Sequence, residues 1–209
     1  MPQGVELISN LRYGSEAAVD IEISSGATMI VLETARLRGR APREADLPHL
    51  RVIHSDPRAM ATLSGDGRPA GEEYSAGVLA RMREHWERFG FGVWMLFEKE
   101  GNRFAGYAGI RHLELEGAPE IELLYAIRSD RWRRGYASEA SREVLRLGFR
   151  ELAPASVIAF TLPHNRGSRG VMEKCGMRFE RGLTHAGLPH VLYRITAAQF
   201  AAFTRSAAT

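Results

Sequence analysis

The sequence predicts an α/β fold in which one mixed β-sheet carries helices on both of its faces. Strands and helices alternate along the chain, but three strands come in succession before the central helix, which argues against a doubly wound parallel sheet. Hydrophobic residues make up 44% and charged residues 25% of the 209 residues, as in a soluble protein with one packed core. This length suits a single domain of the class.

The first predicted elements are one strand and two helices. Alternation of apolar and polar residues predicts a strand over Leu32–Arg40. Apolar residues at helical spacing predict a helix over Glu44–Ser55, which Asp56 and Pro57 end, and a loop rich in glycine follows. Glu72–Phe89 repeats apolar residues at every fourth position, so it predicts a long amphipathic helix.

The rest of the chain predicts six more strands and three helices. The central part predicts a hairpin, a further strand and the central helix, over Val93–Glu98, Arg103–Leu113, Ile121–Ile127 and Ser138–Leu152. The last part predicts a buried strand, a short helix, two strands and a terminal helix that Thr196 caps, over Ser156–Leu162, Arg166–Cys175, Arg178–Leu183, His190–Ile195 and 196–203.

Composition changes near residue 29 and divides the chain in two. Residues 1–28 are rich in glycine, serine and acidic residues without long periodicity, so we expect a flexible tail or an added strand there. The folded domain is expected over 29–209.

Several classes of protein are excluded by simple counts. The single cysteine, Cys175, allows neither an intrachain disulfide nor a site of several thiolates, and no spacing of histidine and acidic residues indicates a metal. No stretch approaches the roughly 20 apolar residues of a membrane helix, and no signal peptide is evident. We therefore expect a cytoplasmic protein without a membrane partner. A net charge of +3 is too low to indicate nucleic-acid binding.

The segment Ile121–Ala140 carries the strongest chemical signal. A strand ends there, a short basic loop containing Arg131, Arg133 and Arg134 follows, and a helix begins just after Gly135. Glycine lets the backbone approach a ligand closely, and the amides of a first helical turn attract anions. The loop therefore predicts a pyrophosphate site. It contains neither a Walker motif nor a dinucleotide-binding glycine pattern.

A second segment, Ser156–Phe179, joins a strand, an Asn-x-x-Ser sequence, a helix and a glycine. Together with the strand–RRGYA–helix unit, it resembles the GNAT superfamily of acetyltransferases. The similarity is greatest to the branch that contains ribosomal-protein N-terminal acetyltransferases. The opening segment 32–50 and the closing segment 190–196 also resemble that branch, so the resemblance spans residues 30 to 203.

The resemblance implies a mostly antiparallel sheet of about seven strands with one splayed pair, and acetyl-CoA as cosubstrate without a metal. The family's loop amides hold the CoA pyrophosphate, which maps that role onto Arg133, Arg134, Gly135, Tyr136 and Ala137. Trp132 stands where the family has glutamine or arginine. The strand before the loop would hold the pantetheine arm through Tyr125, Ala126 and Ile127. Asn165 would bind that arm or order its loop, and it also suits a helix N-cap.

The resemblance also implies two catalytic residues. Glu122 aligns with the glutamate of the family's Glu-Ile-Gly-Tyr strand motif and is expected to remove the proton of the acceptor amine, with Glu120 as the alternative. Ser168 matches the serine that the branch uses as proton donor to the leaving thiolate, although a first-turn serine can also serve the helix alone. The tyrosine of many other family members is replaced by Met172.

The acceptor class stays open at this stage. A primary amine is expected, either the α-amine of a peptide N-terminus or an amine of a small molecule such as an amino sugar, a polyamine or an antibiotic. A catalytically inactive acyl-CoA-binding module is a further alternative, because the tyrosine is missing. His185 and His190 flank the last predicted hairpin and could contact substrate or act as base. A homodimer is one assembly that the sequence allows.

Overall fold

The computed structural model describes residues 31–206, so the predicted tail over residues 1–28 lies outside the described part. The strands are β1 (Leu32–Glu33), β2 (Leu37–Arg40), β3 (Val93–Glu98), β4 (Phe104–Leu115), β5 (Ala118–Ile127), β6 (Ser156–Thr161), β7 (Arg178–His185) and β8 (Leu188–Thr196). The α-helices are α1 (Leu47–His54), α2 (Pro57–Leu63), α3 (Glu72–Phe89), α4 (Tyr136–Glu151), α5 (Arg166–Lys174) and α6 (Ala197–Ser206). Short 3-10 turns cover η1 (Glu44–Asp46) and η2 (Ser129–Arg131).

The strands form one sheet in the order β1-β2-β3-β4-β5-β6-β8-β7. Every neighbouring pair is antiparallel except β5 and β6, which run parallel. The mixed, mostly antiparallel sheet is confirmed. It has eight strands instead of about seven because a turn divides the predicted strand Leu32–Arg40: Thr34 N donates to Leu37 O at 2.9 Å, and Thr34 Oγ1 accepts from Leu37 N at 2.9 Å.

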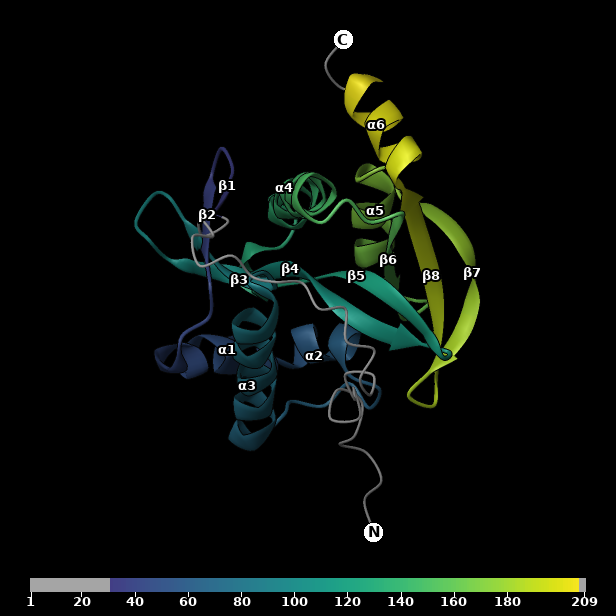
Figure 1. Ribbon diagram of the computed structural model, residues 1–209. Helices are drawn as coiled ribbons and strands as arrows, with labels where there is room; N and C mark the ends of the chain where they lie inside the picture. The colour runs from purple at the N-terminus through teal and green to yellow at the C-terminus, as the bar shows by residue number, and fades with distance from the viewer. Residues whose placement is uncertain (1–30, 207–209) are drawn as a thin grey trace.

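Helices cover both faces of the sheet, as the sequence predicts. In Figure 1, α1, α2 and α3 lie below the sheet, and α4, α5 and α6 lie above it. The upper core packs Trp94, Leu145 and Met172 among its buried side chains, and the lower core packs Leu50, Met82 and Met95. Both layers bury large apolar side chains completely or nearly so, and this burial is the main favourable contribution to folding.

The helix boundaries follow local chemistry. Acidic residues occupy the first turn of α3, which the helix dipole favours, and Gly90 ends the helix in the left-handed conformation with φ 71°. α4 likewise begins directly after Gly135, whose φ is 82°. α4 is strongly amphipathic, and its apolar face lies on β4 and β5.

The structure adds a helix, α2, where the sequence predicts a loop. Asp56 and Pro57 do end α1, but they also start the next helix: Asp56 Oδ1 accepts from Arg58 N at 2.9 Å, and Pro57 takes the first helical position. The same carboxylate accepts a hydrogen bond from Ser129 Oγ, so the start of α2 is joined to the loop after β5.

Two further findings concern ligands and membranes. Within residues 31–206, no helix is long and apolar enough to cross a lipid bilayer. No group of three or more metal-ligating side chains was found in the same range.

Candidate active site

The strands β5 and β6 separate soon after they meet. They register at one position, Glu122 opposite Ile158, whereas β5 pairs with β4 from Ala118 to Ile127. A cavity of about 850 Å³ opens where the two strands diverge, and the second half of β5 and the end of β6 line it. The predicted splayed pair is therefore present, and the central sheet is interrupted there by a space large enough for a ligand.

The pairing of β5 with β4 decides which backbone groups face this gap. Arg128 N donates to Ala105 O at 2.9 Å, and Ala126 lies opposite Tyr107. Hydrogen-bonded and non-bonded pairs alternate in an antiparallel ladder, so Ala126 turns its backbone toward β4, and Tyr125 and Ile127 turn theirs toward β6. Of the three strand residues predicted to hold a ligand, two thus offer backbone groups, whereas Ala126 lines the cavity.

The loop after β5 delivers a set of backbone amides to the same cavity. Gly135 is the N-cap of α4, and no side chain in the described range caps this helix. The first helical bond there runs from Glu139 N to Gly135 O at 3.0 Å. The amides of Tyr136 and Ala137 therefore precede the hydrogen-bonded turns, and together with the helix dipole they form a site for an anion.

The loop arginines differ in their availability. Arg131 is paired with Asp130 at 2.9 Å and lies 3.1 Å from Glu98, so its charge is already compensated. Arg134 lies 3.9 Å from the same glutamate. Arg133, which adopts φ 63°, is exposed, lines the cavity and makes no ion pair within residues 31–206. Arg133 is therefore the loop cation best placed to meet an anion.

Trp132 braces this loop. Its indole Nε1 donates to Ile127 O at 2.7 Å, which fastens the loop to the last residue of β5. The side chain is 40% exposed and lines the cavity. A tryptophan at this position thus replaces the expected glutamine or arginine with a structural contact, and it provides a fluorescent reporter beside the anion site.

Beneath the loop lies a buried carboxylate, Glu98, that the sequence did not single out. Tyr136 Oη donates to its Oε1 at 3.0 Å, and Arg103 Nε donates to its Oε2 at 2.9 Å. Burial opposes ionisation, but the bonds from Tyr136 and Arg103 outweigh it and hold the pKa of Glu98 below its ordinary value. The phenol of Tyr136 is used in this contact, so only its backbone amide can serve a ligand.

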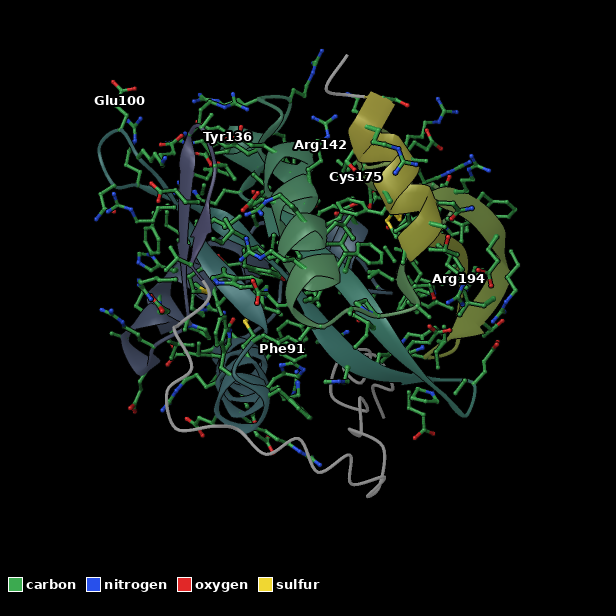
Figure 2. The ribbon with its side chains drawn as sticks, turned by 45° about the horizontal axis from the view of Figure 1, so that its top comes forward. Phe91, Glu100, Tyr136, Arg142, Cys175 and Arg194 are labelled. Carbon is green, nitrogen blue, oxygen red and sulfur yellow. The ribbon has the colours of Figure 1, made fainter. Side chains whose placement is uncertain are left out.

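Replacing Glu98 with glutamine is expected to destabilise the protein by about 2 kcal/mol at pH 7, because Arg103, Arg131 and Tyr136 lose a charged partner. The folded-state pKa of Glu98 is lowered, so its contribution is present above the unfolded value near 4.5 and is lost as the pH falls below it. Urea unfolding at pH 7 and pH 4 measures the free energy of unfolding. The difference in this free energy between wild type and variant should be smaller at pH 4. Glu100→Gln, at the exposed tip of the β3–β4 hairpin (Figure 2), is the control. An equal loss in both variants would contradict the role given to Glu98.

Across the gap, Asn165 organises the start of α5. Its Oδ1 accepts from Ser168 N at 3.0 Å, and its Nδ2 donates to Thr161 Oγ1 at 3.0 Å. The N-cap interpretation is therefore what the structure shows, and the amide also ties the end of β6 to the new helix.

Ser168 meets a partner that the sequence did not connect to it. Tyr125 Oη lies 2.9 Å from Ser168 Oγ and donates to Ser168 O at 3.0 Å. Burial raises the pKa of Tyr125, so the phenol keeps its proton at neutral pH. Met172, at the position of the family's usual tyrosine, is completely buried. Two hydroxyl groups therefore stand at the cavity wall near α5 in place of one.

The opposite side of the cavity carries charged side chains and histidines. Glu122 is 5% exposed and accepts from Arg111 Nε at 2.6 Å through Oε2. It shares its face of β5 with Leu124 and Ala126, as the strand alternation predicts. Four histidines line the cavity: His85 on α3, His164 just before α5, and His185 and His190 on the β7–β8 hairpin.

Cys175 takes no direct part in this arrangement. Its side chain is completely buried near α6 (Figure 2), and burial raises the pKa of its thiol to about 12. A protonated, enclosed thiol is a poor nucleophile. Cys175 therefore serves as a small apolar side chain of the core.

Comparison with known proteins identifies the class of this site. Residues 36–178 match the family model described as an acetyltransferase (GNAT) domain. The chain is thus an acyltransferase and belongs to the GNAT acetyltransferase family.

Relatives in sequence are moderately similar. The chain is 28% identical over 165 residues to the uncharacterized protein YkkB of Bacillus subtilis (strain 168), which covers 78% of this chain and 93% of that one. It is 32% identical over 162 residues to the FsC-acetyl coenzyme A-N(2)-transacetylase of Aspergillus fumigatus, which covers 70% of this chain and 64% of that one.

Solved structures share the fold. An acetyltransferase from Agrobacterium tumefaciens str. C58 superposes with a TM-score of 0.68 at 27% identity, covering 81% of this chain and 95% of that one. A ribosomal-protein-S5-alanine acetyltransferase from Vibrio fischeri superposes with a TM-score of 0.62 at 14% identity, covering 80% and 97% of the two chains. The second likeness concerns the fold alone.

Proposed function

We propose that this protein transfers the acetyl group of acetyl-CoA directly to a primary amine, with the α-amine of a peptide N-terminus as the first candidate acceptor. The observation that carries the proposal is the gap between β5 and β6, where the backbone of Tyr125 and Ile127 faces the cavity next to the amides after Gly135. One side of this space can hold a diphosphate and the other an extended amide chain.

The residues present fit acetyl-CoA, which when bound would supply an acetyl group activated as a thioester. The amides of Gly135, Tyr136 and Ala137 would hold the diphosphate, with Arg133 adding charge, whereas Arg134 is not among the described residues that line the cavity. The backbone of Tyr125 and Ile127 would bond the pantetheine arm. A backbone N–H of this stretch would also stabilise the charge that develops on the carbonyl oxygen during transfer.

The leaving sulfur and the incoming amine would meet different side chains on opposite sides of the reacting centre. Ser168 and Tyr125, linked at 2.9 Å, would give a proton to the departing sulfur. The acceptor amine would approach from the face that carries Glu122, where a carboxylate favours an incoming ammonium group. A pair of proton donors beside the thioester position supports a catalyst over an inactive binding module.

The charge of the cavity favours an acceptor with a single amine. Among the described residues that line it, Glu122 is the one carboxylate, and Arg111 already binds it. Arg81 adds a second cation on the acceptor face. A polyamine would need several carboxylates, so it fits poorly. The Aspergillus relative is named as an N(2)-transacetylase, which supports a small-molecule amine as the second candidate.

An acceptor screen tests the proposal. The protein is mixed with acetyl-CoA and either a peptide with N-terminal alanine, glucosamine or spermidine, and thiol release is followed. We expect the fastest release with the peptide, slower release with glucosamine and little with spermidine. If CoA and acetyl-CoA fail to change the fluorescence of Trp132, or if no amine accelerates thiol release, the proposal is wrong.

A further inference from the structure

We infer that His190, on the β7–β8 hairpin, is the general base that deprotonates the acceptor amine, and that Glu122 acts on it through its charge. The inference rests on the proposed function and assigns to His190 a role that the family resemblance implies for Glu122. It follows from the placement of the imidazole, from its hydrogen bonds and from the ion pair that occupies the glutamate.

The hairpin places two imidazoles on the acceptor face of the cavity. Leu183 pairs with His190, and His185 pairs with Leu188, so the four side chains share one face of the hairpin. Phe160 of β6 packs against both histidine rings, at 4.9 Å from His185 and 5.4 Å from His190. Both imidazoles therefore line the cavity beside the gap.

The hydrogen bonding of His190 leaves a basic nitrogen. Its Nδ1 lies 3.0 Å from Leu188 O, and a carbonyl oxygen can only accept, so Nδ1 carries the proton of the neutral ring. The lone pair is then on Nε2. His85, which also lines the cavity, differs: its Nδ1 contacts Phe91 O at 2.8 Å and its Nε2 accepts from His112 N at 3.1 Å. Both nitrogens of His85 are thus used to hold the fold.

Glu122 is less suited to remove the proton itself. Its Oε2 is bound by Arg111 at 2.6 Å, and the side chain is 5% exposed. Taking up a proton would break a buried, charge-assisted bond and leave the Arg111 guanidinium without its counter-charge. Because Arg111 already occupies Oε2, the carboxylate is poorly placed to take the proton of the amine.

The surroundings keep the imidazole neutral near pH 7. Burial lowers the pKa of His190 from 6.5, while the bond to Leu188 O and the charge of Glu122 act in the opposite direction. Burial also lowers the pKa of the neighbouring His185. The charge of Glu122 raises that pKa, whereas His190 and Arg111 lower it further. A base whose pKa lies below the working pH is neutral there and can accept a proton.

The proton balance of the step is complete. His190 Nε2 takes one proton from the bound ammonium group, and the freed nitrogen lone pair forms the C–N bond at the thioester carbonyl carbon as the C–S bond breaks. The Ser168–Tyr125 pair gives a proton to the sulfur and recovers the one that the nitrogen loses on becoming an amide. The imidazolium then releases its proton to water, so the products are the acetylated amine, CoA and one proton.

The test compares pH–rate profiles of wild type, His190→Gln and Glu122→Gln with the best acceptor of the three-amine screen. We expect the acidic limb of the wild-type pH–rate profile to lie below pH 6.5. In His190→Gln it should move up to the amine's own pKa, about 7.8 for an α-amine. Only about 2% of such an amine is neutral at pH 6, so the loss should be about tenfold or more there and small at pH 8.

Glu122→Gln should move the limb the other way, to lower pH, because the charge that raises the pKa of His190 is gone. His49→Gln, outside the cavity, is the control and should leave the profile unchanged. If Glu122→Gln moves the limb up while His190→Gln leaves it in place, the glutamate is the base and the inference is overturned.

A measurement without acceptor guards against misfolded variants. Nitrogen-15 NMR of the wild-type histidines should show His190 neutral at pH 7 with its proton on Nδ1, and the opposite tautomer would refute the inference. Titration of Trp132 fluorescence with CoA separates a failure of the proposed function from a failure of the role given to His190. If the wild-type protein does not bind CoA, the proposed function itself is refuted.

Discussion

Replacing Gly135 with valine is expected to weaken CoA binding by about 30-fold or more. Gly135 adopts φ 82°, and a β-branched residue is strained in that conformation by roughly 1–2 kcal/mol. Relief of this strain would rotate the peptide groups that open α4 and turn the amides of Tyr136 and Ala137 away from a common anion. Titration of Trp132 fluorescence with CoA measures the affinity.

The matched control for this variant is Gly117→Val. Gly117 has φ 81°, and its Cβ would meet nothing within 4 Å, so the backbone strain is similar but lies in the β4–β5 turn. Both variants should lose similar stability, while Gly117→Val keeps its CoA affinity. Equal affinity in the two variants would contradict an anion site at Gly135.

The second large effect is expected from removing both hydroxyl groups near α5. The double variant Ser168→Ala, Tyr125→Phe should lower the turnover rate by about 100-fold, the lower end for general acid catalysis, with CoA affinity preserved. Each single variant should lose less than half of the activation free energy that corresponds to this 100-fold effect. The reason is that the two hydroxyl groups lie 2.9 Å apart, so either one can replace the other as proton donor.

Steady-state rates at saturating acetyl-CoA and acceptor measure the effect. Tyr193→Phe serves as the control, since it removes the hydroxyl of another buried tyrosine, one that donates to Glu173 Oε1 at 2.9 Å. If the double variant turns over as fast as this control, neither hydroxyl supplies a proton, and the leaving thiolate, with an ordinary thiol pKa near 8.5, departs unassisted.

Most of the fold was predictable because its elements are long and strongly patterned. Glu72–Phe89 and Val93–Glu98 match the predicted bounds. The errors arose in short elements. Helix α2 was missed because Asp56 and Pro57 read as the end of one helix when they are also the cap and first residue of another. The turn at Thr34 depends on a side-chain bond that has no periodic pattern.

The candidate site was predictable where it depends on backbone geometry. Gly135 and the strand before it carry local signals in the sequence, and the structure places them at one cavity. Contacts between distant residues were not predictable: Tyr125 and Ser168 are 43 residues apart, and Glu98 meets Tyr136 across 38. The periodicity of apolar residues along one segment contains no information on contacts between distant segments. The roles of all these residues in catalysis stay predictions.

The single register pair between β5 and β6 has a mechanical consequence. The eight strands behave as two half-sheets, β1 to β5 and β6 to β8, that share very little backbone hydrogen bonding at their seam. A molecule bound between β5 and β6 that forms hydrogen bonds with one strand and contacts the other would hold the two half-sheets together. The melting temperature should therefore climb with the concentration of such a molecule, as mass action requires for anything that binds only the folded chain.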